Sequence, residues 1–233
     1  MLLEEFAIIN WSVDPERLQR SLPPGFEADE QRGVANIAMV AFKNHGFHFR
    51  AAPFVRLSCG QADYRAFVRH GDERGVWFFG GSLSSRLVSV ATQLWKMPWH
   101  HDAIKIAASS TDDSTNDSTN DSTGRWSLDA AGRWGGAAAV LTPTGQAFPA
   151  APAPTINPLV GWYPRRDGGV GRYSVWHQPL QLREADAQVL RCDVFERLAL
   201  IDKGQTPSAA GLQRRIEFEI HTPPTRLAPP SSG

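Results

Sequence analysis

Three polar residues at alternate positions of one segment are the first candidates for binding chemistry. The segment Ala62–Val68 alternates in character, so a strand there would have two different faces, and one of them would carry Gln61, Asp63, Arg65 and Phe67. The planar fork of an arginine suits a carboxylate ligand. If this face points into a cavity, its polar residues form a floor that binds a carboxylate or a carbonyl. The alternative is an internal ion pair that satisfies only itself.

Lys96 is the candidate for covalent chemistry. Trp95 and Trp99 stand close to it in the sequence, and burial beside such rings lowers the pKa of an amine, which must be neutral to attack a carbonyl. Lys96 would then be a catalytic nucleophile. The alternative is a lysine at the end of a helix, where its charge interacts with the carbonyl end of the helix dipole.

The densest group of ionisable residues is His100, His101 and Asp102. A carboxylate beside an imidazole can fix its tautomer, which suits acid-base chemistry or metal binding. Adjacent residues of a strand point to opposite faces, however, so the two histidines do not readily bind one ion. We therefore expect no metal, and we take His101 as a ligand-binding hydrogen-bond donor that lines a pocket.

The stretch from Gly75 to Ile106 must position these groups. It predicts a buried strand at Gly75–Phe79, a glycine turn, a helix over Leu83–Met97 and a second strand up to Ile106. We expect Ser82 or Ser84 to cap the helix and Pro98 to end it. Residues at three- and four-residue spacing would form its buried face: Leu83, Leu87, Val90, Ala91, Leu94 and Trp95.

The rest of the chain predicts more short strands than helices. Strands are expected at Phe6–Trp11, Gly33–Phe42, Ala62–Val68, Arg125–Leu128, Gly136–Thr142, Val170–His177 and Arg215–His221. A helix is expected over Val13–Gly25, with Asp14 as its cap, and another over Asp193–Lys203. A loop is expected over His45–Pro53. This pattern favours an α+β fold whose mainly antiparallel sheet is curved or closed into a barrel or cone, with two or three helices.

One domain over residues 1–225 accounts for this pattern. Its single low-complexity segment, the Asp-Ser-Thr-Asn repeat within residues 109–124, has nothing to bury, and we expect a disordered hairpin tip there. A Pro/Ala linker at Phe148–Pro158 should run extended on the surface. Residues 226–233 form a Pro/Ser tail that we expect to be disordered.

Composition excludes several classes of function. Basic and acidic residues number 24 each, and this zero net charge argues against binding to nucleic acid or to an anionic membrane. Cys59 and Cys192 lie far apart and outside metal-ligand spacing, which argues against a disulfide framework or a zinc site, and no cofactor motif is present. The acidic N-terminus and the lack of an apolar run of about 20 residues predict a soluble cytoplasmic protein.

Several segments together resemble the uncharacterised YqjF-like family (domain of unknown function 2071) of the acetoacetate decarboxylase-like superfamily. They occur in order along most of the chain: Trp11–Leu18, Leu22–Gly25, Asp63–Val68, Gly75–Phe79, Leu94–His101, Pro143–Gly145 and Leu159–Tyr163. The resemblance implies a curved antiparallel barrel or cone with a central cavity. Its best-known relatives decarboxylate beta-keto acids through a lysine Schiff base.

This sequence departs from that chemistry at three places. The relatives have two adjacent lysines, whereas Leu94–Met97 contains only Lys96, at the place of the second one. The relatives have an arginine near the start of the chain, and here it is replaced around Glu4. An acidic residue is also expected before Asp63, and this sequence has Gln61 there. The resemblance therefore implies the fold together with an incomplete decarboxylase site.

These observations predict a protein that binds a small organic acid or carbonyl compound in a barrel cavity through Gln61, Asp63, Arg65 and His101. One alternative is a lyase, such as a decarboxylase, aldolase or dehydratase, that uses Lys96 as a Schiff-base amine. Another is a non-catalytic scaffold whose aromatic surface recruits a protein partner.

Overall fold

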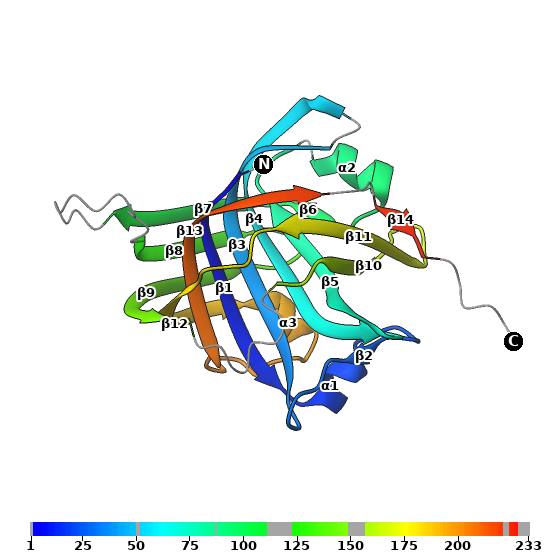
Figure 1. The fold of residues 1–233 in the computed structure, drawn as a ribbon, viewed down its shortest axis with the longest axis horizontal. Coiled ribbons are helices and arrows are strands. Elements are labelled where there is room, and N and C mark those ends of the chain that lie inside the picture. Colours follow the sequence, from blue (N-terminus) through cyan, green and yellow to red (C-terminus); the bar gives the residue numbers. More distant parts are fainter. Residues whose placement is uncertain are drawn as a thin grey trace, which may run out of the picture.

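Seven strands close into a ring in the computed structural model of the chain (Figure 1). In ring order they are β1 (Leu2–Val13), β3 (Ala35–Phe49), β4 (Ala52–His70), β5 (Glu73–Leu83), β10 (Val160–Pro164), β11 (Val170–His177) and β13 (Ala209–Ile220). Neighbours in the ring are antiparallel except β10 and β5, which are parallel. The structure describes residues 2–49, 52–86, 88–110, 123–148, 157–220 and 224–227.

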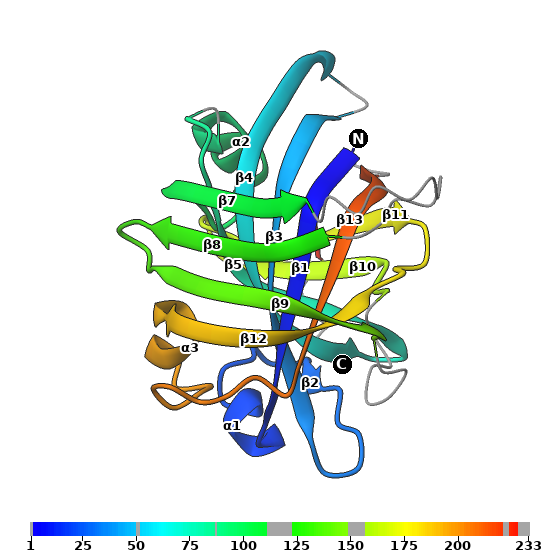
Figure 2. The same cartoon turned by 90° about the vertical axis from the view of Figure 1, so that its left-hand side faces the viewer.

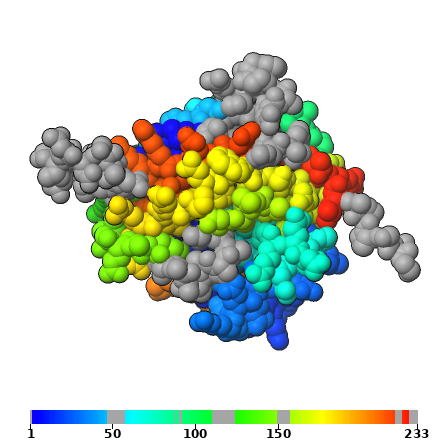
Figure 3. Space-filling model, in the orientation of Figure 1, coloured from blue at the N-terminus to red at the C-terminus, as the bar shows by residue number. Residues whose placement is uncertain are grey.

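Pairing between β11 and β13 closes the ring. Val175, Trp176 and His177 of β11 pair with Ile220, Glu219 and Phe218 of β13. Figure 3 shows these two strands, yellow and orange, side by side on the surface of one face, with β10 next to β11. The fold is therefore the mainly antiparallel closed sheet that the sequence predicts.

A second layer of strands covers one outer side of the ring. Four strands continue the sheet from β13 and cross in front of β1, β3 and β4 in Figure 2. They are β12 (Arg183–Cys192), β9 (Ala137–Ala147), β8 (Thr123–Ala131) and β7 (Ala103–Ser110). The largest apolar core lies between the two layers and includes Trp126, Leu128 and Leu141 of the covering strands.

Among the described residues, three short strands and three short helices complete the fold. The strands are β2 (Glu27–Ala28), which pairs with β4, β6 (Trp99–His101), which pairs with β5, and β14 (Thr225–Arg226), which pairs with β11. The helices are α1 (Pro15–Gln19), α2 (Val88–Trp95) and α3 (Asp193–Arg197). Among the described residues, no helix is long and apolar enough to cross a membrane.

The two faces of β4 are used as the alternation predicts. Ala62, Tyr64, Ala66 and Val68 point outward into the core beneath the second layer. Phe67, on the other face, belongs to a separate apolar cluster inside the ring. The strand therefore separates an apolar outer face from an inner face that carries the polar residues.

The first helix follows its predicted signals at its start. Asp14 caps α1, because its Oδ1 accepts hydrogen bonds from the N–H groups of Glu16 and Arg17 at 2.8 and 3.4 Å. Pro15 occupies the first helical position, and Leu18 is buried in the core. The helix is confirmed, although it ends at Gln19 instead of continuing towards Gly25.

The helix predicted over Leu83–Met97 begins later and ends earlier. Leu83 ends β5, where it pairs with Gln61 of β4, so the strand extends through the expected start of the helix. At the other end Lys96 has a left-handed φ of 56°, which ends α2 at Trp95, three residues before Pro98.

The predicted caps and buried face of this helix were also partly wrong. The Ser82 hydroxyl donates to Asp102, and the Ser84 hydroxyl accepts from the N–H of Gly60, so neither serine caps α2. Leu94, which the predicted buried face included, is 65% exposed. Val88, which that face omitted, is buried. The true start at Val88 changes which positions face the sheet.

The helix predicted over Asp193–Lys203 ends at Arg197. Ala199 has a φ of 54°, its N–H donates to the carbonyl of Glu196, and the N–H of Leu200 donates to that of Phe195. These bonds form a Schellman motif, which normally has glycine at the left-handed position. Alanine there gives no sequence signal that the helix ends.

The loop predicted over His45–Pro53 is wrong. β3 continues to Phe49 and β4 begins at Ala52, so the two strands form a long hairpin whose turn lies outside the described residues. Phenylalanines at 47 and 49 suit strands, and this β-propensity was the missed signal.

Three predicted irregular segments fall largely outside the described residues. Most of the repeat in 109–124 lies there, but β7 and β8 pair on either side of it, down to Ser110 and Thr123. Most of the linker, 149–156, also lies there. Arg226, which we assigned to the tail, belongs to β14, and the tail after Leu227 is outside the described residues.

Trp126 of β8 tests how strongly the second layer supports the ring. Its ring is fully buried and its Nε1 donates to the carbonyl of Glu5 in β1 at 2.8 Å. We expect Trp126→Ala to lower the free energy of unfolding by about 3–5 kcal/mol, because it leaves a cavity and an unpaired carbonyl. Trp176→Ala, at a 43% exposed position, is the matched control and should cost about 1 kcal/mol or less. Equal losses in urea denaturation would contradict this account.

Candidate functional site

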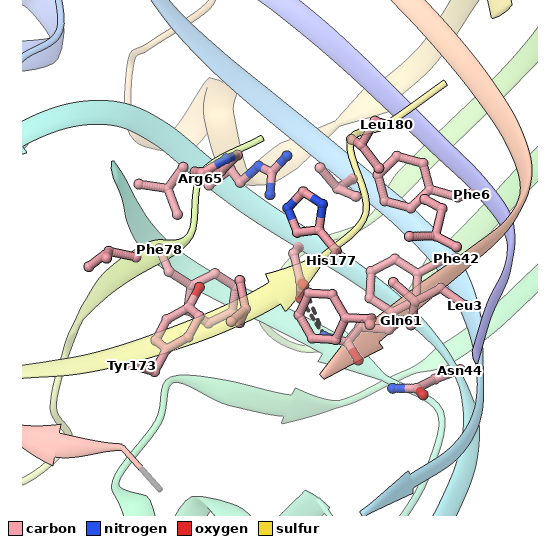
Figure 4. A pocket seen from close by; sticks show the side chains of 18 of the residues that line it. Leu3, Phe6, Phe42, Asn44, Gln61, Arg65, Phe78, Tyr173, His177 and Leu180 are labelled. Atoms are coloured by element: carbon pink, nitrogen blue, oxygen red, sulfur yellow. Dashed lines mark hydrogen bonds between the residues drawn. The ribbon is translucent and has the colours of Figure 1, made fainter. Parts of the chain in front are cut away.

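A cavity of about 110 Å³ lies inside the ring of strands. It is far larger than the 10 to 15 Å³ that one water molecule requires by the same measure, so a small organic molecule fits. Most of its walls are apolar, with Phe6, Phe42, Phe78, Trp99, Val175 and Phe218 among the lining residues. Its polar lining residues are Asn44, Gln61, Asp63, Arg65, Tyr173 and His177. Figure 4 shows Gln61, Arg65, Tyr173 and His177 around one space.

Gln61 and Asp63 form a hydrogen-bonded pair on the inner face of β4. The Nε2 of Gln61 donates to both carboxyl oxygens of Asp63, at 3.0 and 2.9 Å (Figure 4). Burial raises the pKa of Asp63 to about 7, against the smaller lowering effects of this hydrogen bond and of the Arg65 charge. Both protonation states of Asp63 are therefore available near neutral pH.

Arg65 brings a cation into the same cavity. Burial lowers the pKa of its guanidinium, and the neighbouring charges of Tyr173 and Asp63 oppose that effect. Its Nε is buried and donates to no acceptor among the described residues. Among the described residues the guanidinium makes no ion pair with a carboxylate, and it lies above the Phe67 ring at 5.8 Å from its centroid. The self-contained ion pair that the sequence left open is therefore not formed.

Two glycines make room for the polar side chains. Gly81 of β5 pairs with Asp63, and a side chain there would collide with Oδ1 of Asp63. Gly161 of β10 pairs with Tyr173 in the same way, and its missing side chain leaves space for the phenol ring. The strands thus fix the positions of Asp63 and Tyr173 by steric fit.

Three polar lining residues were not identified from the sequence. Asn44 follows Val40 and Phe42 on the inner face of β3, and its buried Oδ1 has no partner among the described residues. Tyr173 and His177 lie on the inner face of β11. The alternation of Val170–His177 places residues 173, 175 and 177 on one face, and this was the available signal.

Lys96 and His101 are not among the cavity-lining residues that the structure describes. Lys96 is half-buried, and its carbonyl accepts a hydrogen bond from the N–H of Arg166 at 3.0 Å. Met97 and Trp99, one and three positions later, line the cavity instead. His101 is exposed on β6. The structure thus brings Gln61, Asp63 and Arg65 together and places the other two candidates elsewhere.

Sequence comparison identifies the family. The sequence model of DUF2071, described as an uncharacterized conserved protein, matches residues 1–212. The chain belongs to the DUF2071 family. Among proteins of curated function, none matches it in sequence.

Solved structures show which fold this DUF2071 protein has. An acetoacetate decarboxylase-like enzyme from Sphingomonas wittichii RW1 superposes with a TM-score of 0.67 at 15% identity, covering 97% of this chain and 91% of that one. The enduracididine biosynthesis enzyme MppR, complexed with pyruvate, has a TM-score of 0.63 at 15% identity over 97% and 89% of the chains. Acetoacetate decarboxylase from Legionella pneumophila has a TM-score of 0.60 at 13% identity over 95% and 87%. The fold is acetoacetate decarboxylase-like.

The histidine cluster of this DUF2071 protein is divided among different surroundings. His100 is half-buried and stacks on Trp134, with 4.7 Å between ring centroids, and burial together with the Arg166 charge lowers its pKa to about 4. The carboxylate of Asp102 accepts from the Ser82 hydroxyl at 2.5 Å. His100 is therefore neutral at pH 7 and stacked away from the cavity-lining residues.

Thiol and metal chemistry have little support at this DUF2071 site. Burial and the charge of Asp63 raise the pKa of Cys59 to about 11, so its thiol stays protonated at neutral pH. Among the described residues, no group of three or more histidine, cysteine, aspartate or glutamate side chains is arranged to hold a metal ion. The remaining candidates for chemistry in the cavity are Asp63, Arg65, Tyr173 and His177.

The raised pKa of Asp63 predicts a particular dependence of stability on pH. The pKa of Asp63 rises from 3.8, its ordinary value and that of the unfolded chain, to about 7 in the folded protein. Between these two pH values the folded state therefore binds more protons than the unfolded state. Stability should therefore be greatest at the acidic end and fall as pH rises to about 7, by up to about 1.4 kcal/mol per pH unit from this group.

Asp63→Asn tests this by removing the titration while keeping the shape of the side chain. Urea denaturation from pH 5 to pH 8 should show the variant gaining stability relative to the natural protein as pH rises. Parallel pH profiles for the two proteins would show that Asp63 does not titrate differently in the fold.

Proposed function

We propose that the barrel cavity binds a small organic acid or carbonyl compound, with Arg65 as the group that holds its negative oxygen. The observation that carries the proposal is the state of Arg65, a cation in a mainly apolar cavity whose buried Nε has no acceptor in the part of the chain that the structure describes. A buried donor without a partner costs about 1–3 kcal/mol, and more for a charged group. A ligand oxygen removes this cost, and an anionic one also neutralises the charge.

The other lining residues favour a ligand with a short apolar part. A cavity of about 110 Å³ admits a small molecule only, and its phenylalanine, valine and tryptophan walls contact carbon better than polar groups. Protonated Asp63 supplies a donor and Asn44 an acceptor, each on the cavity wall. A short acid or keto compound matches both kinds of surface.

Structures with this fold support the same class of ligand. Structures of MppR have been solved in complex with pyruvate and with the condensation product of pyruvate and imidazole 4-carboxaldehyde. At 13–15% identity these neighbours share only the fold with the present chain. The ligand class for this chain therefore rests on Arg65 and Asp63, and the neighbours agree with it.

Calorimetry with pyruvate tests the proposal. We expect binding by the natural protein and roughly 10- to 100-fold weaker binding by Arg65→Met, because a charge-assisted hydrogen bond contributes about 1.5–3 kcal/mol. Arg125→Met, which removes an exposed arginine of β8, is the matched control and should bind as the natural protein does. Acetone, which lacks the carboxylate, should bind more weakly than pyruvate. Equal affinity of both arginine variants for pyruvate would overturn the role of Arg65.

Reduction with borohydride separates non-covalent binding from Schiff-base chemistry. Since no lysine is found among the described lining residues, we expect no change in intact mass after treatment with pyruvate, acetoacetate or acetaldehyde. An adduct that Lys96→Ala lacks would contradict this and establish Lys96 as the nucleophile of a lyase.

A further inference from the structure

We propose that this cavity catalyses enolisation of a 2-oxo acid without a lysine: Asp63 removes a proton from the carbon next to the carbonyl while Arg65 holds the carbonyl oxygen. This inference rests on the proposed function, since it requires the acid to bind in the cavity. It adds a reaction and a substrate class to that site.

The spacing of Asp63 and Arg65 suits one small substrate. They are two residues apart on the inner face of β4, and residues at this spacing are about 6.6 Å apart along a strand. Both side chains line the same cavity. A molecule of a few carbon atoms between them contacts the guanidinium at one end and the carboxylate at the other.

Arg65 matches the oxygen pattern of a 2-oxo acid. Such an acid presents a carboxylate oxygen and a keto oxygen side by side, and the guanidinium has several N–H donors in one plane, among them the unpartnered Nε. When the adjacent carbon loses a proton, negative charge develops on the keto oxygen. A cation fixed in an apolar cavity stabilises that charge more strongly than water does.

Asp63 has the free capacity to act as the base. A carboxylate has about four acceptor positions, and Gln61 supplies a single NH₂ group to its two oxygens. Contact with Gly81 fixes the carboxyl group against the barrel wall. A carboxyl that exists in both protonation states near pH 7 can accept a proton and return it.

The step balances within these groups. The C3–H bond of the acid breaks and its proton moves to an oxygen of Asp63. The electron pair forms the C2=C3 double bond, and the π electrons of the C2 carbonyl move to the keto oxygen beside Arg65. The proton on Asp63 exchanges with solvent, and return of a proton from Asp63 to C3 then restores the keto form. In heavy water the returned particle is a deuteron, so the substrate gains deuterium at C3.

His177 is the other lining group that could take the proton. Its Nδ1 lies 2.8 Å from the carbonyl oxygen of Gln178, and its ring is stacked with Phe218 at 6.2 Å between centroids. Asp63 is the sole carboxylate among the described lining residues. We assign the base to Asp63 because it shares β4 with Arg65.

Proton NMR of pyruvate in heavy water tests the inference. The full chain should speed the loss of the methyl signal, and Asp63→Asn should slow that loss at least about 100-fold while calorimetry still shows pyruvate binding. Arg65→Met should lose both exchange and binding. Lys96→Ala should keep both, because a Schiff base, which also promotes this exchange, is not involved. Circular dichroism confirms that each variant is folded.

The outcomes distinguish this inference from the proposed function. Pyruvate binding without exchange overturns enolisation and leaves the binding function standing, whereas absence of binding overturns both. Exchange that persists in Asp63→Asn and disappears in His177→Gln gives the base to His177 and overturns the assignment to Asp63. Loss of exchange in Lys96→Ala would show a covalent route and overturn the lysine-free reaction.

Discussion

The two-residue period of β4 is the constraint on which the rest of the structure depends. Its outward residues, such as Tyr64, fill the core beneath the second layer, so the intervening residues have no place except the inside of the ring. A shift of one residue would put the Tyr64 ring into the cavity and the charges of Asp63 and Arg65 into an apolar core. Because that core is large, the register of β4 is strongly specified, and with it the position of both charges.

Closure of the ring encloses these charged residues in a cavity. On an open sheet the inner face of β4 would meet solvent, and the pKa of Asp63 would not be raised by burial. The pairing of β11 with β13 encloses that face and adds Tyr173 and His177 to its polar groups. Burial of Asp63 and Arg65 in this cavity lowers the stability of the fold. Burial of apolar side chains elsewhere in the protein offsets that loss.

The sequence predicted those features that depend on local pattern. Alternation gave the two faces of β4, and Asp14 with Pro15 gave the start of α1. The ends of α2 and α3 depend on left-handed Lys96 and Ala199, residue types that carry no such signal, and so these boundaries were missed. The cavity depends on pairings between distant strands, such as β5 with β10, which no local pattern encodes. Alternation places Tyr173 on one face of its strand, but these pairings decide which face lines the cavity, and so Asn44 and Tyr173 were missed.

The left-handed Lys96 also bears on the chemistry. It ends α2, and the chain then lines the cavity with Met97, before β6, and with Trp99, the first residue of β6, so this part of the wall is apolar. An amine on this apolar wall would be desolvated. Lys96, however, is not among the described lining residues, which here are Met97 and Trp99. The ionisable groups among the described lining residues are a carboxyl, a guanidinium, a phenol and an imidazole. Such a set can move protons and stabilise oxygen anions, and the proposed enolisation uses both properties.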